Sequence, residues 1–214
     1  MSPVLIVFGA LALIGGVIYA VHRAEQQRRE ALARIADALG FHFTPGDAVQ
    51  PGGGFPLYER GHGRRASNLM TGETAGQPVE LFDYRFVTGS GKNQTTHNQT
   101  VVVFPQGARG LPDFELSPEN ILHKIGQVFG YQDIDFEDDP EFSKSYLLRG
   151  RDEPAIRNTF TRSVRAFLAQ HRGWTVQTRA GAALLCRERR RVKPEDLPGF
   201  LADALSILSG LGSS

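Results

Sequence analysis

The chain has only one cysteine and almost no net charge. Cys186 is the single cysteine among 214 residues, so no internal disulfide can form and a disulfide-stapled framework is excluded. The 24 Lys and Arg residues stand against 23 Asp and Glu, for a formal net charge of +1. This near-neutral total argues against a dedicated nucleic-acid binder. A content of 41% hydrophobic and 22% charged residues is that of an ordinary folded protein.

Complete catalytic motifs are missing as well. The segment Gly89-Ser90-Gly91-Lys92 resembles the end of a phosphate-binding loop, but that motif needs glycine where Phe86 stands and Ser or Thr where Asn93 stands. The six histidines are scattered, without the spacing of metal ligands. Cys186 lies in an apolar stretch, which favours a buried structural thiol over a nucleophile. The sequence therefore implies no cofactor and names no catalytic residue.

One long apolar run is present at the N-terminus. Residues 3–21, PVLIVFGALALIGGVIYAV, hold no charge, and as a helix they match the thickness of a bilayer core. His22 and Arg23 follow in place of a cleavage site, so residues 1–22 are predicted to form an uncleaved transmembrane signal anchor. Because positive charge lies only on the C-terminal flank, we expect a single-pass protein of the bacterial inner membrane with a cytoplasmic domain. The alternative is a buried helix of a soluble protein.

The rest of the chain predicts an α+β fold, with a mixed, mainly antiparallel sheet and packed helices. Residues 23–40 have helical spacing of apolar residues and form a juxtamembrane helix that stops at Gly40. Residues 41–214 form a soluble domain, with two subdomains, 41–130 and 131–214, as an alternative. Strands are expected at residues 41–43, 55–60, 64–70, 78–87, 95–104, 174–179 and 182–188, and helices at residues 117–130, 153–170 and 194–211.

Three carboxylates alternate with apolar residues between positions 133 and 137. Asp133, Asp135 and Glu137 can converge on Ca²⁺ or Mg²⁺, which prefer oxygen ligands. The same alternation is typical of a strand whose carboxylates face water while Ile134 and Phe136 face the core. A solvated strand face is our main interpretation, and a metal site is the alternative.

Charge is segregated along the chain. Residues 113–141 carry nine acidic side chains and one basic one, whereas residues 149–193 carry twelve basic and three acidic ones. The alternative to a functional basic module is that the two blocks neutralise one another within the fold. The side chains predicted to contact anionic lipid headgroups or a protein partner are Arg187, Arg189, Arg190 and Arg191.

The expected partners follow from these features. They are the lipid bilayer, anionic headgroups or a protein, and no nucleic acid. Ala12, Gly16 and Ala20 lie four residues apart and form a line of small residues on one helix face. Such a line lets two helices pack closely, so a homodimer through the anchor is a further expectation.

A resemblance rests on several segments taken together. The chain resembles a family of uncharacterised bacterial membrane-anchored proteins, from the N-terminal apolar run to the last helix. This resemblance implies a bacterial membrane protein with a domain that looks non-enzymatic, and it implies no catalytic residue. The segments are Leu81-Phe82-Asp83-Tyr84, Thr88-Gly89-Ser90-Gly91-Lys92, Gln99-Thr100-Val101-Val102-Val103-Phe104, Leu111-Pro112-Asp113-Phe114, Asp133-Ile134-Asp135-Phe136 and Phe142-Ser143-Lys144-Ser145-Tyr146-Leu147-Leu148-Arg149-Gly150.

Two classes of function follow. The main hypothesis is a membrane-anchored, non-enzymatic binding or scaffold module at the cytoplasmic face of a bacterial membrane. The alternative is a membrane-bound enzyme, a metal-assisted hydrolase that uses the acidic cluster, or an enzyme that uses polar loop residues such as Lys92, Asn93 and His97.

Overall fold

The computed structural model describes residues 3–47, 54–119 and 133–212. The strands are β1 (His42–Thr44), β2 (His62–Thr74), β3 (Gln77–Thr88), β4 (Thr95–Phe104), β5 (Phe114–Pro118), β6 (Tyr146–Gly150), β7 (Thr175–Arg179) and β8 (Ala182–Cys186). The helices are α1 (Pro3–Leu39), α3 (Pro140–Ser145), α4 (Glu153–Thr159), α5 (Arg162–Gln170) and α6 (Leu197–Gly212), with 3-10 turns η1 (Pro56–Glu59), η2 (Gly91–Asn93) and η3 (Pro194–Asp196).

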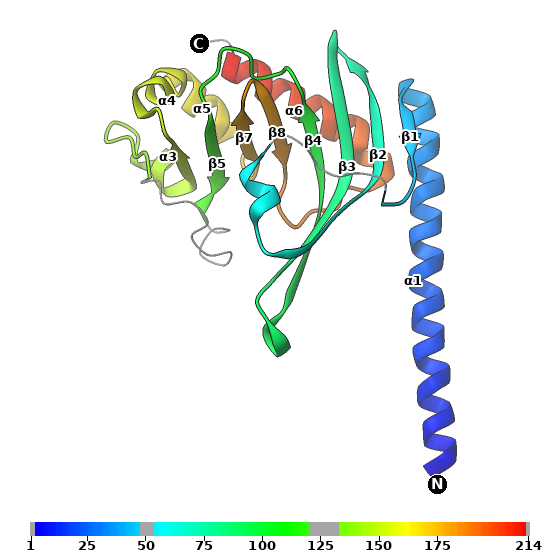
Figure 1. Cartoon of the computed structure of the whole chain (residues 1–214). Helices are drawn as coiled ribbons and strands as arrows, with labels where there is room; N and C mark the ends of the chain where they lie inside the picture. The colour runs from blue at the N-terminus through cyan, green and yellow to red at the C-terminus, as the bar shows by residue number, and fades with distance from the viewer. Residues whose placement is uncertain (1–2, 48–53, 120–132, 213–214) are drawn as a thin grey trace.

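All eight strands form one sheet in the order β1-β2-β3-β4-β8-β7-β5-β6, and every neighbouring pair is antiparallel. The expected α+β class is therefore confirmed. Helix α1 stands beside the β1 edge, while α3, α4 and α5 gather at the β6 end (Figure 1). Strands from before and after residue 130 alternate in the sheet, because β8 and β7 lie between β4 and β5. Residues 41–130 and 131–214 thus share a single sheet.

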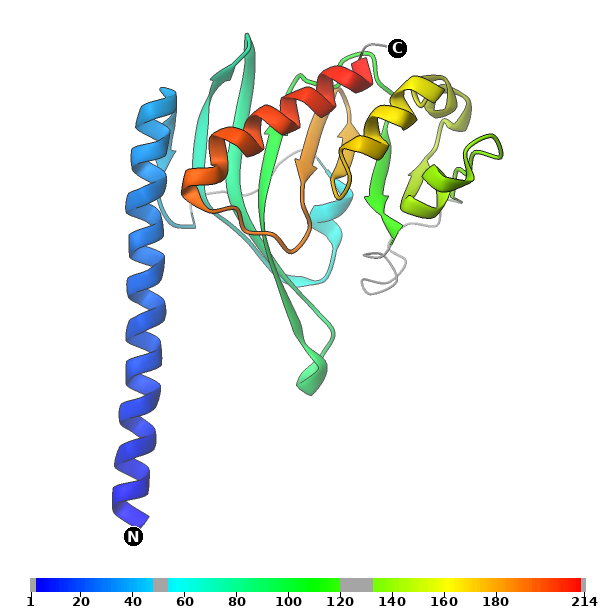
Figure 2. The same ribbon diagram turned by 180° about the vertical axis from the view of Figure 1, so that it is seen from behind.

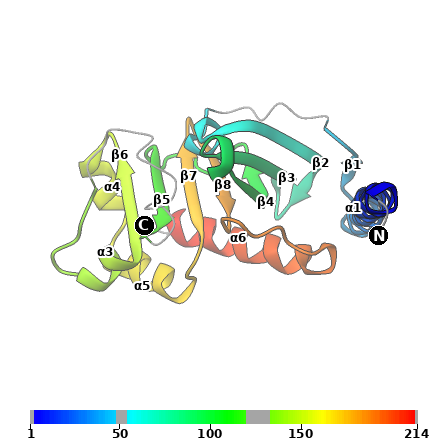
Figure 3. The same cartoon turned by 90° about the horizontal axis from the view of Figure 1, so that it is seen from below.

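An apolar core lies on each face of the sheet. Alternate residues of a strand point to opposite faces, so Val102 joins the core beneath α6 whereas Val101 joins the core beneath η1. Helix α6 crosses the first face (Figure 2), and η1 lies on the other side, as the view from below shows (Figure 3). The predicted hairpin of β3 and β4 is confirmed, with both faces apolar and a central place in the sheet.

Three local expectations differ from the structure. The predicted strand over residues 55–60 is the turn η1, because Pro56 has no N–H to donate to a ladder. The helix predicted over residues 153–170 is divided into α4 and α5, and the Thr161 hydroxyl accepts a hydrogen bond from Val164 N at 3.4 Å at the start of α5. Of the helix predicted over 117–130, residues 117 and 118 belong to β5, and residues 120–132 lie outside the described residues.

The N-terminal helix differs most from expectation. Across the ranges that the structure describes, none of the helices combines the length and the apolar character that crossing a membrane requires. The predicted transmembrane signal anchor, and the single-pass location in a bacterial inner membrane with a cytoplasmic domain, are therefore wrong.

The second half of α1 belongs to the body of the fold. It packs against β1, β2 and η3, and Leu32 and Ala36 are buried in the core beneath α6. The helix ends at Leu39, and Gly40 follows with a left-handed φ of 71°, as its C-terminal glycine predicts. The juxtamembrane helix expected over residues 23–40 is thus the sheet-bound half of one longer helix.

Trp174 is expected to hold α6 on the sheet. Its side chain is fully buried and stacks on Phe200 of α6, with ring centroids 4.8 Å apart. Trp174→Ala should lower the free energy of unfolding by about 3 to 5 kcal/mol, the usual cost of removing a large buried aromatic side chain, as measured by urea denaturation. Trp174→Phe keeps an aromatic ring and should lose less than half as much. Equal losses in the two variants would show that the ring stacking does not hold α6.

Candidate functional site

Buried ion pairs join α1 to the sheet. Arg28 of α1 donates hydrogen bonds to both carboxylate oxygens of Asp83 on β3, at 3.0 and 2.7 Å. Arg191, which follows β8, donates to the same carboxylate at 2.9 Å and to Glu25 of α1 at 2.9 and 2.5 Å. Asp83 is only 7% exposed. We call Glu25, Arg28, Asp83 and Arg191 the junction network.

The junction network keeps both of its carboxylates ionised. Hydrogen bonds from Arg191 lower the pKa of Glu25 and outweigh the opposite effect of burial. Burial by itself raises the pKa of Asp83, but the hydrogen bonds and charges of Arg28 and Arg191 outweigh it, and the pKa lies below its ordinary value. Two guanidinium groups face two carboxylates, so the charges of the network cancel.

A polar groove opens beside the junction network, between α1 and the sheet. Its volume is about 540 Å³, and it forms where α1, β2, β3, β4 and the segment after β8 meet. Strand pairing places Arg85 of β3 opposite Arg65 of β2 and opposite Asn98 of β4, so the three form a row across the sheet. The lining residues are Val21, Glu25, Arg29, Asp47, Arg65, Ser67, Asp83, Tyr84, Arg85, Thr96, Asn98, Gln99 and Arg191.

Two arginines of this groove have no acidic partner among the described residues. Arg65 is paired with Asp47 at 2.5 Å, and Arg191 belongs to the junction network. Arg29 and Arg85 line the groove without such a partner, and Nε of Arg29 is a buried donor that makes no hydrogen bond. The groove therefore has an excess of positive charge.

A second buried ion cluster fixes η1 on the opposite face of the sheet. Arg60 is 2% exposed and donates hydrogen bonds to Glu188, at 2.6 Å, and to Glu115. Burial lowers the pKa of Arg60, but the charges of the two carboxylates outweigh that effect and raise it. Cys186 is fully buried near this cluster, and burial raises the pKa of its thiol well above the ordinary value. This position fits the predicted structural cysteine and opposes a nucleophilic role.

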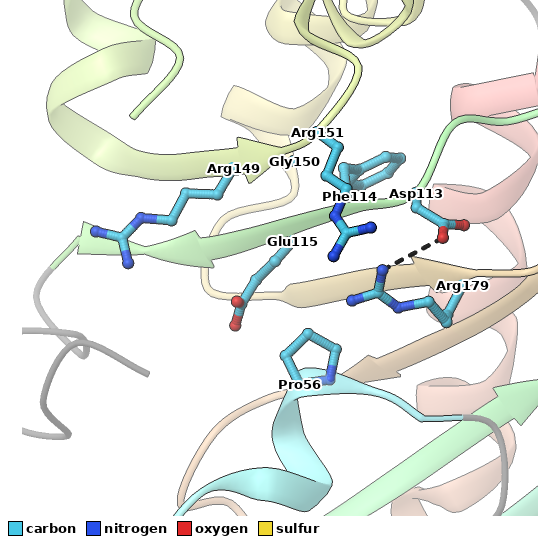
Figure 4. Close-up of a pocket in the computed structure, with 8 residues that line it drawn as sticks. All are labelled: Pro56, Asp113, Phe114, Glu115, Arg149, Gly150, Arg151 and Arg179. Atoms are coloured by element: carbon cyan, nitrogen blue, oxygen red, sulfur yellow. Dashed lines mark hydrogen bonds and ion pairs between the residues drawn. The ribbon is translucent and has the colours of Figure 1, made fainter. Parts of the chain in front are cut away.

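A small cavity lies next to the Arg60 cluster (Figure 4). Arg179 and Asp113 form an ion pair at its edge, with 3.3 Å between Nη1 and Oδ2. The cavity holds only about 20 Å³, which is room for roughly one water molecule. It is too small for a substrate or cofactor, unlike the groove beside α1.

The three carboxylates predicted as metal ligands are not placed as a ligand set. Asp133, Asp135 and Glu137 are exposed while Ile134 and Phe136 are buried, so the alternation expected of a solvated face is present, but the expected strand is not, because residues 133–137 are irregular. In residues 3–47, 54–119 and 133–212, no group of three His, Cys, Asp or Glu side chains can hold a metal ion. The hypothesis of a metal-assisted hydrolase therefore gains no ligand set from this part of the chain.

The polar loop residues considered for an enzyme lie apart. Lys92 and Asn93 are exposed in η2, at the tip of the β3–β4 hairpin (Figure 1). His97 is instead buried on β4, where it stacks on Phe86 with ring centroids 4.6 Å apart. Burial is also the main cause that lowers the pKa of His97. These three residues do not share one site.

The four arginines predicted to contact lipid or a partner are divided between two environments. Arg191 is held in the junction network, and Arg187 lies 3.7 Å from Asp203 of α6. Arg189 and Arg190 are the two that are exposed. The predicted contact with lipid or a partner stays a prediction for all four arginines.

Sequence reasoning missed the junction network and the groove. One signal was present, because Asp83 stands between Phe82 and Tyr84 in a strand with two apolar faces. A carboxylate in such a place must have a cationic partner, since an unpaired buried charge is very costly. The signal does not say which arginines are the partners.

The first half of α1 carries an exposed apolar surface. It projects beyond the sheet, away from the other elements (Figures 1 and 2). A Cβ atom added at Gly15 or Gly16 would meet nothing within 4 Å. We call this surface the apolar segment; its large side chains are 54–70% exposed and are Phe8, Leu11, Leu13, Ile14, Val17, Ile18, Tyr19 and Val21.

Comparison with known proteins identifies a structural neighbour. The chain matches no family model and no curated protein. Its structure is similar to the crystal structure of the mycobacterial trehalose monomycolate transport factor A, TtfA, with a TM-score of 0.55 and 13% sequence identity over 88% of this chain and 95% of that chain. At this identity the likeness establishes a shared fold and no shared activity. Membership of a family of membrane-anchored proteins stays a prediction.

Removing the Asp83 carboxylate should loosen α1 from the sheet. Asp83→Ala leaves Arg28 and Arg191 without their shared partner, so the free energy of unfolding should fall by about 3 to 5 kcal/mol, and amide exchange across residues 23–39 should become faster. Urea denaturation and hydrogen exchange measure the two effects. The matched control is Asp37→Ala, which removes an exposed carboxylate of α1 outside the network. This variant should lower the free energy of unfolding by under about 0.5 kcal/mol. Equal behaviour of the two variants would contradict the role of the network.

The junction network should also make the fold sensitive to acid. Because the pKa values of Asp83 and Glu25 are lowered in the folded state, their stabilisation is complete above the unfolded values of about 4. It is lost as the pH falls through the lower, folded pKa values. Urea midpoints between pH 7 and pH 3 should therefore drop more for the wild type than for Asp83→Ala. Parallel pH curves would rule out a contribution from Asp83.

Proposed function

We propose that this protein is a non-enzymatic binding and scaffold module, and that a second copy of the chain docks on its apolar segment. The observation that carries this proposal is the exposure of eight large apolar side chains on one projecting helix. Large exposed apolar surfaces mark interaction sites, because their burial removes apolar area from water.

The attachment of α1 supports a scaffold role. The junction network and the buried Leu32 and Ala36 fix the second half of the helix to the sheet. Because one continuous helix joins the two halves, the apolar segment is presented at a fixed direction relative to the sheet. A preorganised docking element loses little conformational entropy when it binds.

A second copy of the chain is the occupant that the segment fits. The segment holds no charge that would repel an identical helix. Ala12, Gly16 and Ala20 lie on one side of it, where small side chains allow two helix backbones to approach closely. The open space around Gly16 leaves that side accessible to a partner helix.

The structural neighbour is consistent with a binding role. TtfA is named a transport factor and not an enzyme. At 13% identity this support concerns the type of role alone, and trehalose monomycolate is not proposed as a ligand of this chain.

A pair of glycine substitutions tests the docking. Gly16→Ile places a branched side chain on the small-residue side, so the dimer should weaken by about tenfold or more in Kd. Gly15→Ile is the matched control, because it adds the same side chain to a neighbouring open position on another side of the helix and should leave the dimer intact. Sedimentation equilibrium of the full chain measures both.

Two results would overturn the proposal. One is a wild-type chain that is monomeric at high micromolar concentration. The other is equal binding of the wild type, Gly15→Ile and Gly16→Ile to neutral phosphatidylcholine vesicles with no dimer in solution, which would make lipid the occupant instead of a second copy.

A further inference from the structure

The groove beside the junction network has two positive charges that the described chain does not neutralise. Glu25 and Asp83 are matched by Arg28 and Arg191, and Asp47 is matched by Arg65. Every acidic residue that lines the groove is therefore already paired. The unmatched charges that remain among its lining residues are those of Arg29 and Arg85.

The hydrogen-bond donors of the groove are also incompletely used. Nε of Arg29 is buried without a hydrogen-bond acceptor, although buried donors in folded proteins are nearly always satisfied. Arg85 and Asn98 also line the groove and lie side by side in the pairing of β3 and β4. Ser67 and Thr96 add hydroxyl groups to the same lining. The arrangement offers several donors to one acceptor-rich ligand.

We propose that this groove binds a phosphate monoester, with Arg29 and Arg85 as its two cationic contacts. A guanidinium group donates two parallel hydrogen bonds that match the oxygens of a phosphate. Two unmatched arginines balance the two negative charges of a monoester dianion. A ligand with a single carboxylate would neutralise only one of the two arginines. The volume of about 540 Å³ lies within the range of small-molecule sites.

The proposed phosphate site does not depend on the docking of a second copy at the apolar segment. It is built from the second half of α1, the sheet and the segment after β8, and Val21 is the residue that the groove and the apolar segment share. Phosphate monoesters occur in soluble metabolites and in the headgroup of phosphatidic acid. Both present the same dianion to Arg29 and Arg85.

The test measures phosphate binding by the full chain and its variants. Titration calorimetry with glycerol 3-phosphate should detect binding, with inorganic phosphate as a weaker probe. Arg29→Gln and Arg85→Gln should each weaken glycerol 3-phosphate binding by about 10- to 100-fold, the effect of losing a hydrogen bond to a charged group. Arg34→Gln on the same helix and Lys92→Gln on the hairpin are matched controls, because both are exposed and outside the groove. They should bind like the wild type.

A vesicle arm distinguishes the two sources of the dianion. Phosphatidylcholine vesicles with about one fifth phosphatidic acid should compete with glycerol 3-phosphate if the natural ligand is a headgroup, and should fail to compete if it is a soluble metabolite. Either result supports the site. The proposal is overturned if no phosphate probe binds at about 10 mM, or if Arg29→Gln, Arg85→Gln and the controls have the same affinity. Unfolding curves of each variant confirm that a loss of binding is not a loss of fold.

Discussion

The carboxylate of Asp83 is the constraint on which the rest of this structure depends. It lies on a central strand of the sheet and is nearly inaccessible to water, so its charge must be matched inside the protein. Arg28 and Arg191 match it from opposite ends of the chain. By meeting at one carboxylate they fix the direction of α1, close the segment after β8 against the sheet, and leave the polar groove between these elements.

The sheet separates two kinds of environment. Beneath α6 lies the larger apolar core, which extends to the buried residues Leu32 and Ala36 of α1. Beneath η1 the core is smaller, and the Arg60 cluster holds the turn in place through Glu115 and Glu188. In the junction network two arginines match two carboxylates, and in the Arg60 cluster one arginine contacts two carboxylates. Arg29 and Arg85 differ, because their charges face a groove and not a carboxylate.

The alternation of apolar residues predicted the β3–β4 and β7–β8 hairpins, because each hairpin forms between neighbouring segments. The order of the sheet was not predictable in the same way, since β4 pairs with β8 and β5 with β7 across long stretches of chain. The N-terminal run led to the wrong prediction of a membrane anchor, because none of the helices in the described residues combines the length and the apolar character that crossing a membrane requires. The candidate site was missed because Glu25, Asp83 and Arg191 are distant in the sequence.

The sequence by itself determined the α+β class, the hairpins, the solvated alternation of Asp133, Asp135 and Glu137, and the burial of Cys186, since each depends on local spacing and on apolar burial. The tertiary structure alone decided which charges meet. Arg191 is one of four similar arginines in the sequence, yet only its position opposite α1 turns it into the partner of Asp83. Coulomb energy depends on distance in space, and that distance is set by the packing of α1 on the sheet.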